Sequence, residues 1–157
     1  MISKNRKIFL AGHKGMVGSA ILKRLKKDGY KKIILVAKKK LNLLNQKKVE
    51  SFLKRKKPHI VIIAAAKVGG ILANNNFKAN FIYENLTIQS NIIHGSYLSG
   101  VKNLIFLGSS CIYPKRTKQP IKESYFMTGP LEETNDAYSI AKIAGVKMCM
   151  EYSKQYK

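Results

Sequence analysis

The chain has 157 residues, of which 45% are apolar and 24% are charged, a composition typical of one globular domain that excludes a disordered or collagen-like chain. No apolar run approaches the ~20 residues that cross a bilayer, and the N-terminal stretch lacks the apolar core of a signal peptide, so we expect a cytoplasmic protein that does not bind membranes. The formal net charge of +22 comes mainly from lysines spread along the whole chain, which favours a solvated basic surface over a specific nucleic-acid site.

Short apolar runs alternate along the chain with longer stretches of helical periodicity. In chain order we expect a strand at 7–11, a helix at 17–27, a strand at 33–36, a helix at 47–56, a strand at 60–64, a helix at 77–98, a strand at 104–107 and a helix at 137–156. Continuous apolar runs are typical of strands buried on both faces. The alternation therefore predicts an α/β fold with a doubly wound parallel sheet, the Rossmann architecture. That fold has further strands after the last helix, so residues 1–157 are expected to be one domain that is incomplete at its C-terminal side.

The first predicted strand ends at a glycine-rich loop that opens the first helix. The loop reads Gly12, His13, Lys14, Gly15, Met16, Val17 and Gly18. In this context glycines permit a tight turn, bring backbone N–H groups close to a pyrophosphate and let helix and strand pack closely. The loop predicts a dinucleotide site, and a purely structural glycine turn is the alternative.

The end of the second predicted strand bears on the choice of cofactor. An NAD site usually has an acidic residue there to hold the ribose hydroxyls, whereas residues 36–40 here read VAKKK. Lys38, together with Lys14, can neutralise a 2′-phosphate instead. The sequence thus favours NADP (NADPH) over NAD, with merely exposed lysines as the alternative.

Tyr138 and Lys142 lie four residues apart near the start of the last predicted helix, so their side chains share one face. A nearby ammonium lowers the pKa of a phenol, which suits Tyr138 to proton transfer at a carbonyl oxygen while a nicotinamide exchanges hydride. Lys142 would also hydrogen-bond the nicotinamide ribose. Ser109 follows the strand at 104–107, at the sheet edge where ligands bind, and can polarise the same oxygen. Together these residues predict a catalytic set.

Four longer strings extend these motifs. They begin at Ala11, Ala64, Leu107 and Tyr138 and read AGHKGMVGSA, AAAKVGGI, LGSSCIYP and YSIAKIAG. On these strings the whole chain resembles the extended short-chain dehydrogenase/reductases of the NAD-dependent epimerase/dehydratase family, in particular those of GDP-L-fucose biosynthesis. The resemblance implies an NADPH-dependent oxidoreductase and isomerase that epimerises GDP-4-keto-6-deoxy-D-mannose at C3 and C5 and then reduces its C4 ketone to give GDP-L-fucose.

The resemblance also implies roles for individual residues. Cys111 would be the acid/base group of epimerisation, with Ser109 and Tyr138 at the C4 oxygen; without the resemblance, an inert buried cysteine is the preferred interpretation. Residues 107–110 would line the nicotinamide side of the cofactor and 38–43 the adenosine side. A short third strand is expected near 41–44, so that Ala64, Ala65 and Ala66 end the fourth strand. The expected cofactor-binding residues are Gly12, His13, Lys14, Gly15, Met16, Val17, Gly18, Lys38, Leu43, Ala64, Ala65, Leu107, Gly108, Ser109, Ser110 and Lys142.

The chain departs from the family beyond its last predicted helix. Family members pair the cysteine with a histidine after that helix, whereas His13, His59 and His94 all precede it. The C-terminal substrate domain that holds the GDP moiety is also missing. We therefore expect the short chain to be inactive by itself, although it descends from an enzyme with a GDP-sugar substrate. By resemblance the helices at 77–98 and 137–156 would pair two chains into a homodimer.

Three alternatives stay open. The chain is a non-catalytic nucleotide-binding fragment, or it belongs to another sugar-nucleotide epimerase or dehydratase, or, outside enzymes, it is a basic nucleic-acid-binding protein. The two cysteines, Cys111 and Cys149, have no spacing typical of a zinc site or a disulfide framework, so we expect reduced thiols and no metal.

Overall fold

The computed structural model describes residues 3–156, which fall into two compact units; residues 1, 2 and 157 of the predicted domain lie outside the described part. The first unit holds the described residues up to Ala66 together with Thr87–Leu107, and the second holds Lys67–Leu86 and the described residues from Gly108 onward. In chain order the elements are β1 (Ile8–Ala11), α1 (Met16–Lys27), β2 (Ile33–Ile34), α2 (Gln46–Lys56), β3 (Ile60–Ile63), α3 (Ile71–Asn76), α4 (Lys78–Leu98), β4 (Asn103–Phe106), η1 (Ser110–Ile112), η2 (Glu123–Tyr125) and α5 (Asp136–Tyr156). Within the described range no helix is both long and apolar enough to cross a bilayer.

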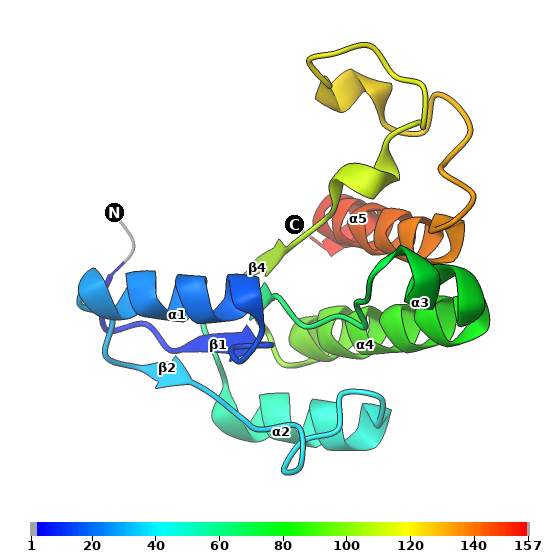
Figure 1. Ribbon diagram of the computed structural model, residues 1–157. Helices are drawn as coiled ribbons and strands as arrows, with labels where there is room; N and C mark the ends of the chain where they lie inside the picture. Colours follow the sequence, from blue (N-terminus) through cyan, green and yellow to red (C-terminus); the bar gives the residue numbers. More distant parts are fainter. Residues whose placement is uncertain (1–2, 157) are drawn as a thin grey trace. The chain divides into compact units, whose positions relative to one another are not determined.

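A parallel sheet with the strand order β2-β1-β3-β4 forms the centre of the first unit and confirms the predicted Rossmann class. β1 pairs with β3 over its whole length, from Ile8 opposite Ile60 to Ala11 opposite Ile63. Figure 1 shows α1 and α2 on opposite faces of these strands. Because the chain leaves β1 toward β2 and then returns to the other side of β1 as β3, the carboxyl ends of β1 and β3 form the switch point at which such sheets bind ligands.

The two faces of the sheet bury different side chains because successive residues of a strand point in opposite directions. One cluster contains Ile8, Leu10, Ile60 and Ile62, with Ile21, Leu22 and Leu25 of α1 packed against it. Phe9 lies between two members of this cluster in β1 and points the other way, with its ring 5.0 Å from the ring of Phe52 in α2. Burial on both faces explains why all residues of β1 and β3 are apolar.

The predicted short strand near 41–44 is wrong, because this segment forms a turn. The Asn42 side-chain oxygen accepts the N–H of Leu44 at 3.1 Å, and the Asn42 carbonyl accepts the N–H of Asn45. The Asn45 side chain then caps α2 by accepting the N–H of Lys48 at 2.9 Å. Asparagine side chains thus form local bonds with the backbone, and these bonds favour a turn and a helix cap over a strand.

Three other elements differ from the expectation. β4 is less buried than predicted, with Ile105 51% exposed, because it is an edge strand of the described sheet and pairs only with β3. β2 is limited to two half-buried residues. The short helix α3 precedes α4 and was not predicted, since six residues are too few to show a helical period.

Replacing Phe52 by Ala removes the ring that packs on Phe9 and is expected to lower the free energy of unfolding by about 3–5 kcal/mol. Urea denaturation followed by circular dichroism measures the change. Lys47→Ala, at an exposed position of the same helix, is the control and should change the free energy by less than about 0.5 kcal/mol. Equal effects in the two variants would contradict the packing described for α2.

Candidate functional site

The glycine loop of the first unit brings backbone segments closer together than side chains allow. Gly12 has a φ of +86°, and a Cβ there would lie 2.5 Å from the backbone nitrogen of Ala65. A Cβ at Gly18 would lie 2.1 Å from the carbonyl oxygen of Gly12. The loop is therefore pressed against the end of β3 on one side and against α1 on the other. The first N–H groups of α1, which begins at Met16 after Gly15, lack partners within the helix and make its N-terminus favourable for anions.

A cavity of about 230 Å³ opens beside this loop, at the switch point of the sheet. Eight of the predicted cofactor residues line it, namely Gly12, His13, Lys14, Gly15, Lys38, Leu43, Ala64 and Ala65. Met16 and Val17 do not line it and are exposed, whereas Gly18 lies behind the loop as a packing residue. None of the described lining residues is Asp or Glu, so Lys14 and Lys38 give the cavity a positive charge. The cavity therefore suits an anionic ligand.

The turn at 41–44 supplies wall residues of the cavity, of which only Leu44 lies outside the range 38–43 that was expected to line the adenosine side. Leu41, Asn42 and Leu44 line the cavity beside the predicted Leu43, and the side chain of Asn91 in α4 donates to the carbonyl of Leu43 at 2.8 Å. The contact joins residues 48 positions apart, so no local pattern reveals it. Asn91 fixes the turn that forms this wall.

The second unit brings together the predicted proton-transfer residues. Ser109 immediately precedes η1, and Tyr138 lies in the first turn of α5, where the two side chains share a hydrogen bond. The Lys142 ammonium lies 5.9 Å from the centroid of the Tyr138 ring, and the residue is only 4% exposed. The spacing on α5 thus places both side chains on one face, as predicted.

The electrostatics of this cluster differ from the sequence-based expectation. Burial raises the pKa of Tyr138 above 10.0, the hydrogen bond to Ser109 opposes that shift, and the nearby Cys111 adds to it. Burial also lowers the pKa of Lys142 to about 8. The expected lowering of the phenol pKa is therefore wrong for this chain by itself, because desolvation of the phenolate outweighs the favourable interactions.

Cys111 lies in the same cluster and has a partner that was not predicted. The side-chain amide of Asn135 donates to the Cys111 sulfur at 3.2 Å, and the Cys111 N–H donates to the Ser109 hydroxyl oxygen at 3.4 Å. Asn135 stands just before α5, and no local pattern of the sequence indicates the contact of its amide with a sulfur 24 residues away. The predicted residues Gly108 and Ser110 lie nearby in the chain, and Leu107 ends the first unit with its N–H bonded to Ile63; their roles toward a cofactor stay predictions.

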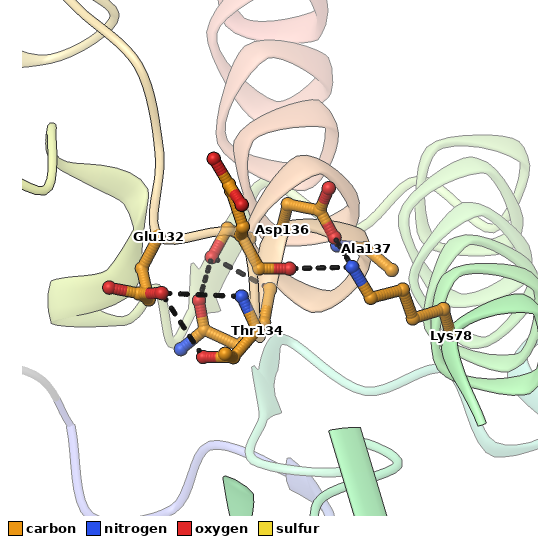
Figure 2. Close-up of polar contacts among 8 residues, drawn as sticks. Lys78, Glu132, Thr134, Asp136 and Ala137 are labelled. Atoms are coloured by element: carbon orange, nitrogen blue, oxygen red, sulfur yellow. Dashed lines mark hydrogen bonds and ion pairs between the residues drawn. The ribbon is translucent and has the colours of Figure 1, made fainter. Parts of the chain in front are cut away.

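Charged side chains of the second unit hold the segment that leads into α5. The Lys78 ammonium donates to the backbone carbonyl of Glu133 at 2.6 Å and to the Asp136 carboxylate at 3.2 Å (Figure 2). The Glu132 carboxylate accepts from the backbone N–H and the hydroxyl of Thr134 and pairs with Lys115 at 3.0 Å. The segment is thus fixed on both sides of Asn135.

The three histidines of the sequence are all in the first unit. His13 lines the cavity, the ring of His59 accepts the backbone N–H of Lys7, and the His94 ring lies 6.1 Å from that of Tyr97. Among the described residues of the second unit there is thus no imidazole to accompany Cys111. Nor do the described residues contain a group of three His, Cys, Asp or Glu side chains suited to a metal ion.

The buried Lys142 predicts a pH dependence of stability. The folded chain holds the Lys142 proton only below about pH 8, whereas an unfolded lysine keeps it up to about 10.5, so the unfolded state binds more protons between these values and stability rises with pH. Lys142→Met removes this titration, so the variant is expected to be the more stable protein near pH 7 and to lose that advantage toward about pH 10. Urea denaturation at both pH values measures the difference. Lys147→Met, on an exposed side of α5, is the control, and an equal response in both variants would contradict the burial of Lys142.

Known proteins match nearly the whole length of this chain. The model of the NAD dependent epimerase/dehydratase family matches residues 8–157. A GDP-L-fucose synthase of Sinorhizobium fredii is 57% identical over 96% of this chain and 48% of its own length, so the chain spans about half of that relative. A GDP-D-glycero-L-gluco-heptose synthase from Campylobacter jejuni, solved in the presence of NADPH, aligns with a TM-score of 0.95 and 44% identity over 99% of this chain and 46% of its own.

A third relative is a GDP-L-fucose synthetase from Naegleria fowleri bound to NADP. It aligns with a TM-score of 0.88 and 29% identity over 99% of this chain and 50% of its own. The match of the family model covers the glycine loop and the Ser109, Cys111, Tyr138 and Lys142 cluster alike. With nearly its whole length matched and both groups of residues inside the match, this chain belongs to the NAD dependent epimerase/dehydratase family.

Proposed function

We propose that the protein to which this chain belongs is an NADPH-dependent 3,5-epimerase and 4-reductase that converts GDP-4-keto-6-deoxy-D-mannose to GDP-L-fucose. The observation that carries the proposal is the cluster of Ser109, Tyr138, Lys142 and Cys111 in one unit of a chain 57% identical to a GDP-L-fucose synthase. The cluster supplies a proton donor for a ketone oxygen and a thiol for proton exchange at carbon, and the proposed reaction needs both. We place this enzyme in the cytoplasm, where its nucleotide substrates occur.

The first unit fits NADPH. Gly12 and Gly18 leave no room for a Cβ, so backbone N–H groups can reach a diphosphate at the start of α1. Lys14 and Lys38 line the cavity and would pair with the 2′-phosphate, which no acidic side chain among its described lining residues would repel. When bound, NADPH supplies the hydride for reduction.

The second unit fits the proton transfers. The 4-keto group acidifies the hydrogens on C3 and C5, so the Cys111 sulfur can remove one of them while the electron pair moves to the ketone oxygen as an enolate. Delivery of a proton from water to the opposite face of that carbon completes each epimerisation, and the proton that Cys111 took then passes from its sulfur to solvent. In the reduction, Tyr138 donates its phenolic proton to the C4 oxygen while a hydride arrives at C4. Ser109, whose hydroxyl lies beside the Tyr138 phenol, would donate a hydrogen bond to the same oxygen. Lys142, as an ammonium, stabilises the phenolate that remains.

A related GDP-linked heptose is the second candidate substrate. The Campylobacter heptose synthase has 44% sequence identity to this chain and a TM-score of 0.95. The corresponding values for the Naegleria GDP-L-fucose synthetase are 29% and 0.88. Incubation of the purified protein with NADPH and either GDP-4-keto sugar, with NMR of the products, decides between them. If the protein to which this chain belongs oxidises NADPH with neither of the two sugars, both proposals fail. If the 157-residue chain by itself binds NADPH without turnover, it is a non-catalytic nucleotide-binding fragment.

We also propose that the protein is a homodimer that uses α4 and α5. Both helices expose large apolar side chains, among them Tyr83 and Leu98 on α4 and Ile140 and Met150 on α5. Exposed apolar surface of this kind favours association with a partner. Light scattering during gel filtration measures the mass.

Tyr138→Phe removes the proton donor and is expected to lower kcat for ketone reduction by about 10²–10⁴-fold without changing the Kd of NADPH. Loss of NADPH absorbance with the keto sugar gives the rate, and fluorescence titration gives the Kd. Tyr156→Phe makes the same change at an exposed position of α5 and should retain the full rate. A normal rate for Tyr138→Phe would remove the phenol from the mechanism.

Lys38→Glu places a carboxylate in the cavity and is expected to weaken NADPH binding by about tenfold or more while leaving NADH binding nearly unchanged. Titration of both dinucleotides measures the selectivity. Lys39→Glu changes the net charge by the same amount at a residue that does not line the cavity. It therefore separates the loss of a direct contact with the 2′-phosphate from a general weakening of the positive charge of the protein. If both variants lose affinity equally for both dinucleotides, the assignment of the 2′-phosphate contact fails.

A further inference from the structure

Asn135 makes a specific contact with the thiol of the second unit. Its side-chain nitrogen donates to the Cys111 sulfur at 3.2 Å, across 24 residues of sequence. A helix-capping asparagine needs only its side-chain oxygen, which accepts backbone N–H groups. A cap therefore does not use the side-chain nitrogen of Asn135, and this nitrogen donates to the Cys111 sulfur instead.

The surroundings of Asn135 hold its amide in one orientation. Its side-chain oxygen accepts from the Ser139 hydroxyl at 3.2 Å, and its backbone carbonyl accepts from the same hydroxyl at 3.1 Å and from the Ser139 N–H at 3.0 Å. The Asn135 N–H donates to the carbonyl of Glu132 at 3.1 Å. Since the oxygen end is held by a fully buried serine, the nitrogen end points to Cys111.

The segment that carries Asn135 is anchored from both sides. The Lys78 ammonium donates to the carbonyl of Glu133, two residues before Asn135, and to the carboxylate of Asp136, directly after it (Figure 2). Lys115 and Thr134 hold Glu132 at the start of the same segment. A donor fixed in this way does not have to reorganise when charge develops on its partner.

We propose that Asn135 is a positioning residue for Cys111, which holds the sulfur in place and stabilises its thiolate form during proton exchange. The backbone of Cys111 is held separately, by its bond to the Ser109 hydroxyl, so the sulfur is the group that Asn135 controls. An N–H donor bonds more strongly to an anionic sulfur than to a neutral thiol, which favours the form that accepts a proton from carbon. When that carbon–hydrogen bond breaks, the new S–H bond forms and the electron pair goes to the substrate ketone. The assignment of this reaction to Cys111 rests on the proposed function, whereas the contact itself does not.

Alkylation of the thiol tests the proposal without any substrate. In a Cys149→Ser background, Cys111 is the only cysteine of the 157 residues, and mass spectrometry measures its rate of reaction with iodoacetamide. Asn135→Asp keeps the oxygen that bonds Ser139 but removes the donor, and it is expected to slow alkylation about tenfold. Asn76→Asp makes the same substitution at an exposed position of the same unit, at the end of α3, so it is the matched control and should react within about twofold of the parent. Urea denaturation shows whether each variant is folded.

The proton exchange gives a second measurement. With the keto sugar in D₂O and no NADPH, Asn135→Asp should slow the uptake of deuterium at the carbons beside the ketone about tenfold while the KM for NADPH in the full reaction stays unchanged. Parental rates of alkylation and deuterium uptake in Asn135→Asp would overturn the role of Asn135, and so would equal losses in Asn76→Asp. If the parent protein does not act on the keto sugar but alkylation responds as expected, the proposed function fails and the positioning of Cys111 stands.

Discussion

The close approach of the Gly12 backbone to Ala65 is the contact on which the first unit depends. It joins the ends of β1 and β3, the two central strands, and the equally close contact of Gly18 with Gly12 fixes the start of α1 at the same point. Any side chain at either position would displace the helix from the sheet. The same geometry exposes the N-terminal amides of α1 beside a positively charged cavity, so the packing that stabilises the fold also prepares a site for an anion.

The second unit keeps groups in environments that do not favour their charged forms. Burial lowers the pKa of Lys142 to about 8 and raises that of Tyr138, so both the ammonium and the phenolate are disfavoured relative to water. A side chain chosen for stability alone would be apolar at position 142, since it is only 4% exposed. Side chains that a stable core would not contain are found most often at functional sites. The buried Tyr138 and Lys142, in the first two turns of α5, fit that expectation.

The sequence predicted the elements whose signal is local and repeated. The apolar runs of β1 and β3 and the glycine loop between β1 and α1 are each visible within a few residues, and each lies within about one residue of its predicted position. The same holds for Tyr138 and Lys142, because the helical period alone places them on one face. Turn chemistry at Asn42, the short helix α3 and the exposure of Ile105 escaped prediction, since these depend on side-chain bonds to the backbone or on which neighbours a strand has.

Residue order by itself thus determined the α/β class, the glycine loop and the identity of the groups able to move protons, because periodicity and residue chemistry are properties of short segments. Only the tertiary structure decided that Asn135 bonds the Cys111 sulfur, that Asn91 holds the turn at Leu43 and that burial raises the pKa of Tyr138. Those features arise when segments distant in sequence meet and exclude water. The free energy of a buried charge or hydrogen bond depends on all the atoms around it, and no single stretch of the chain contains them.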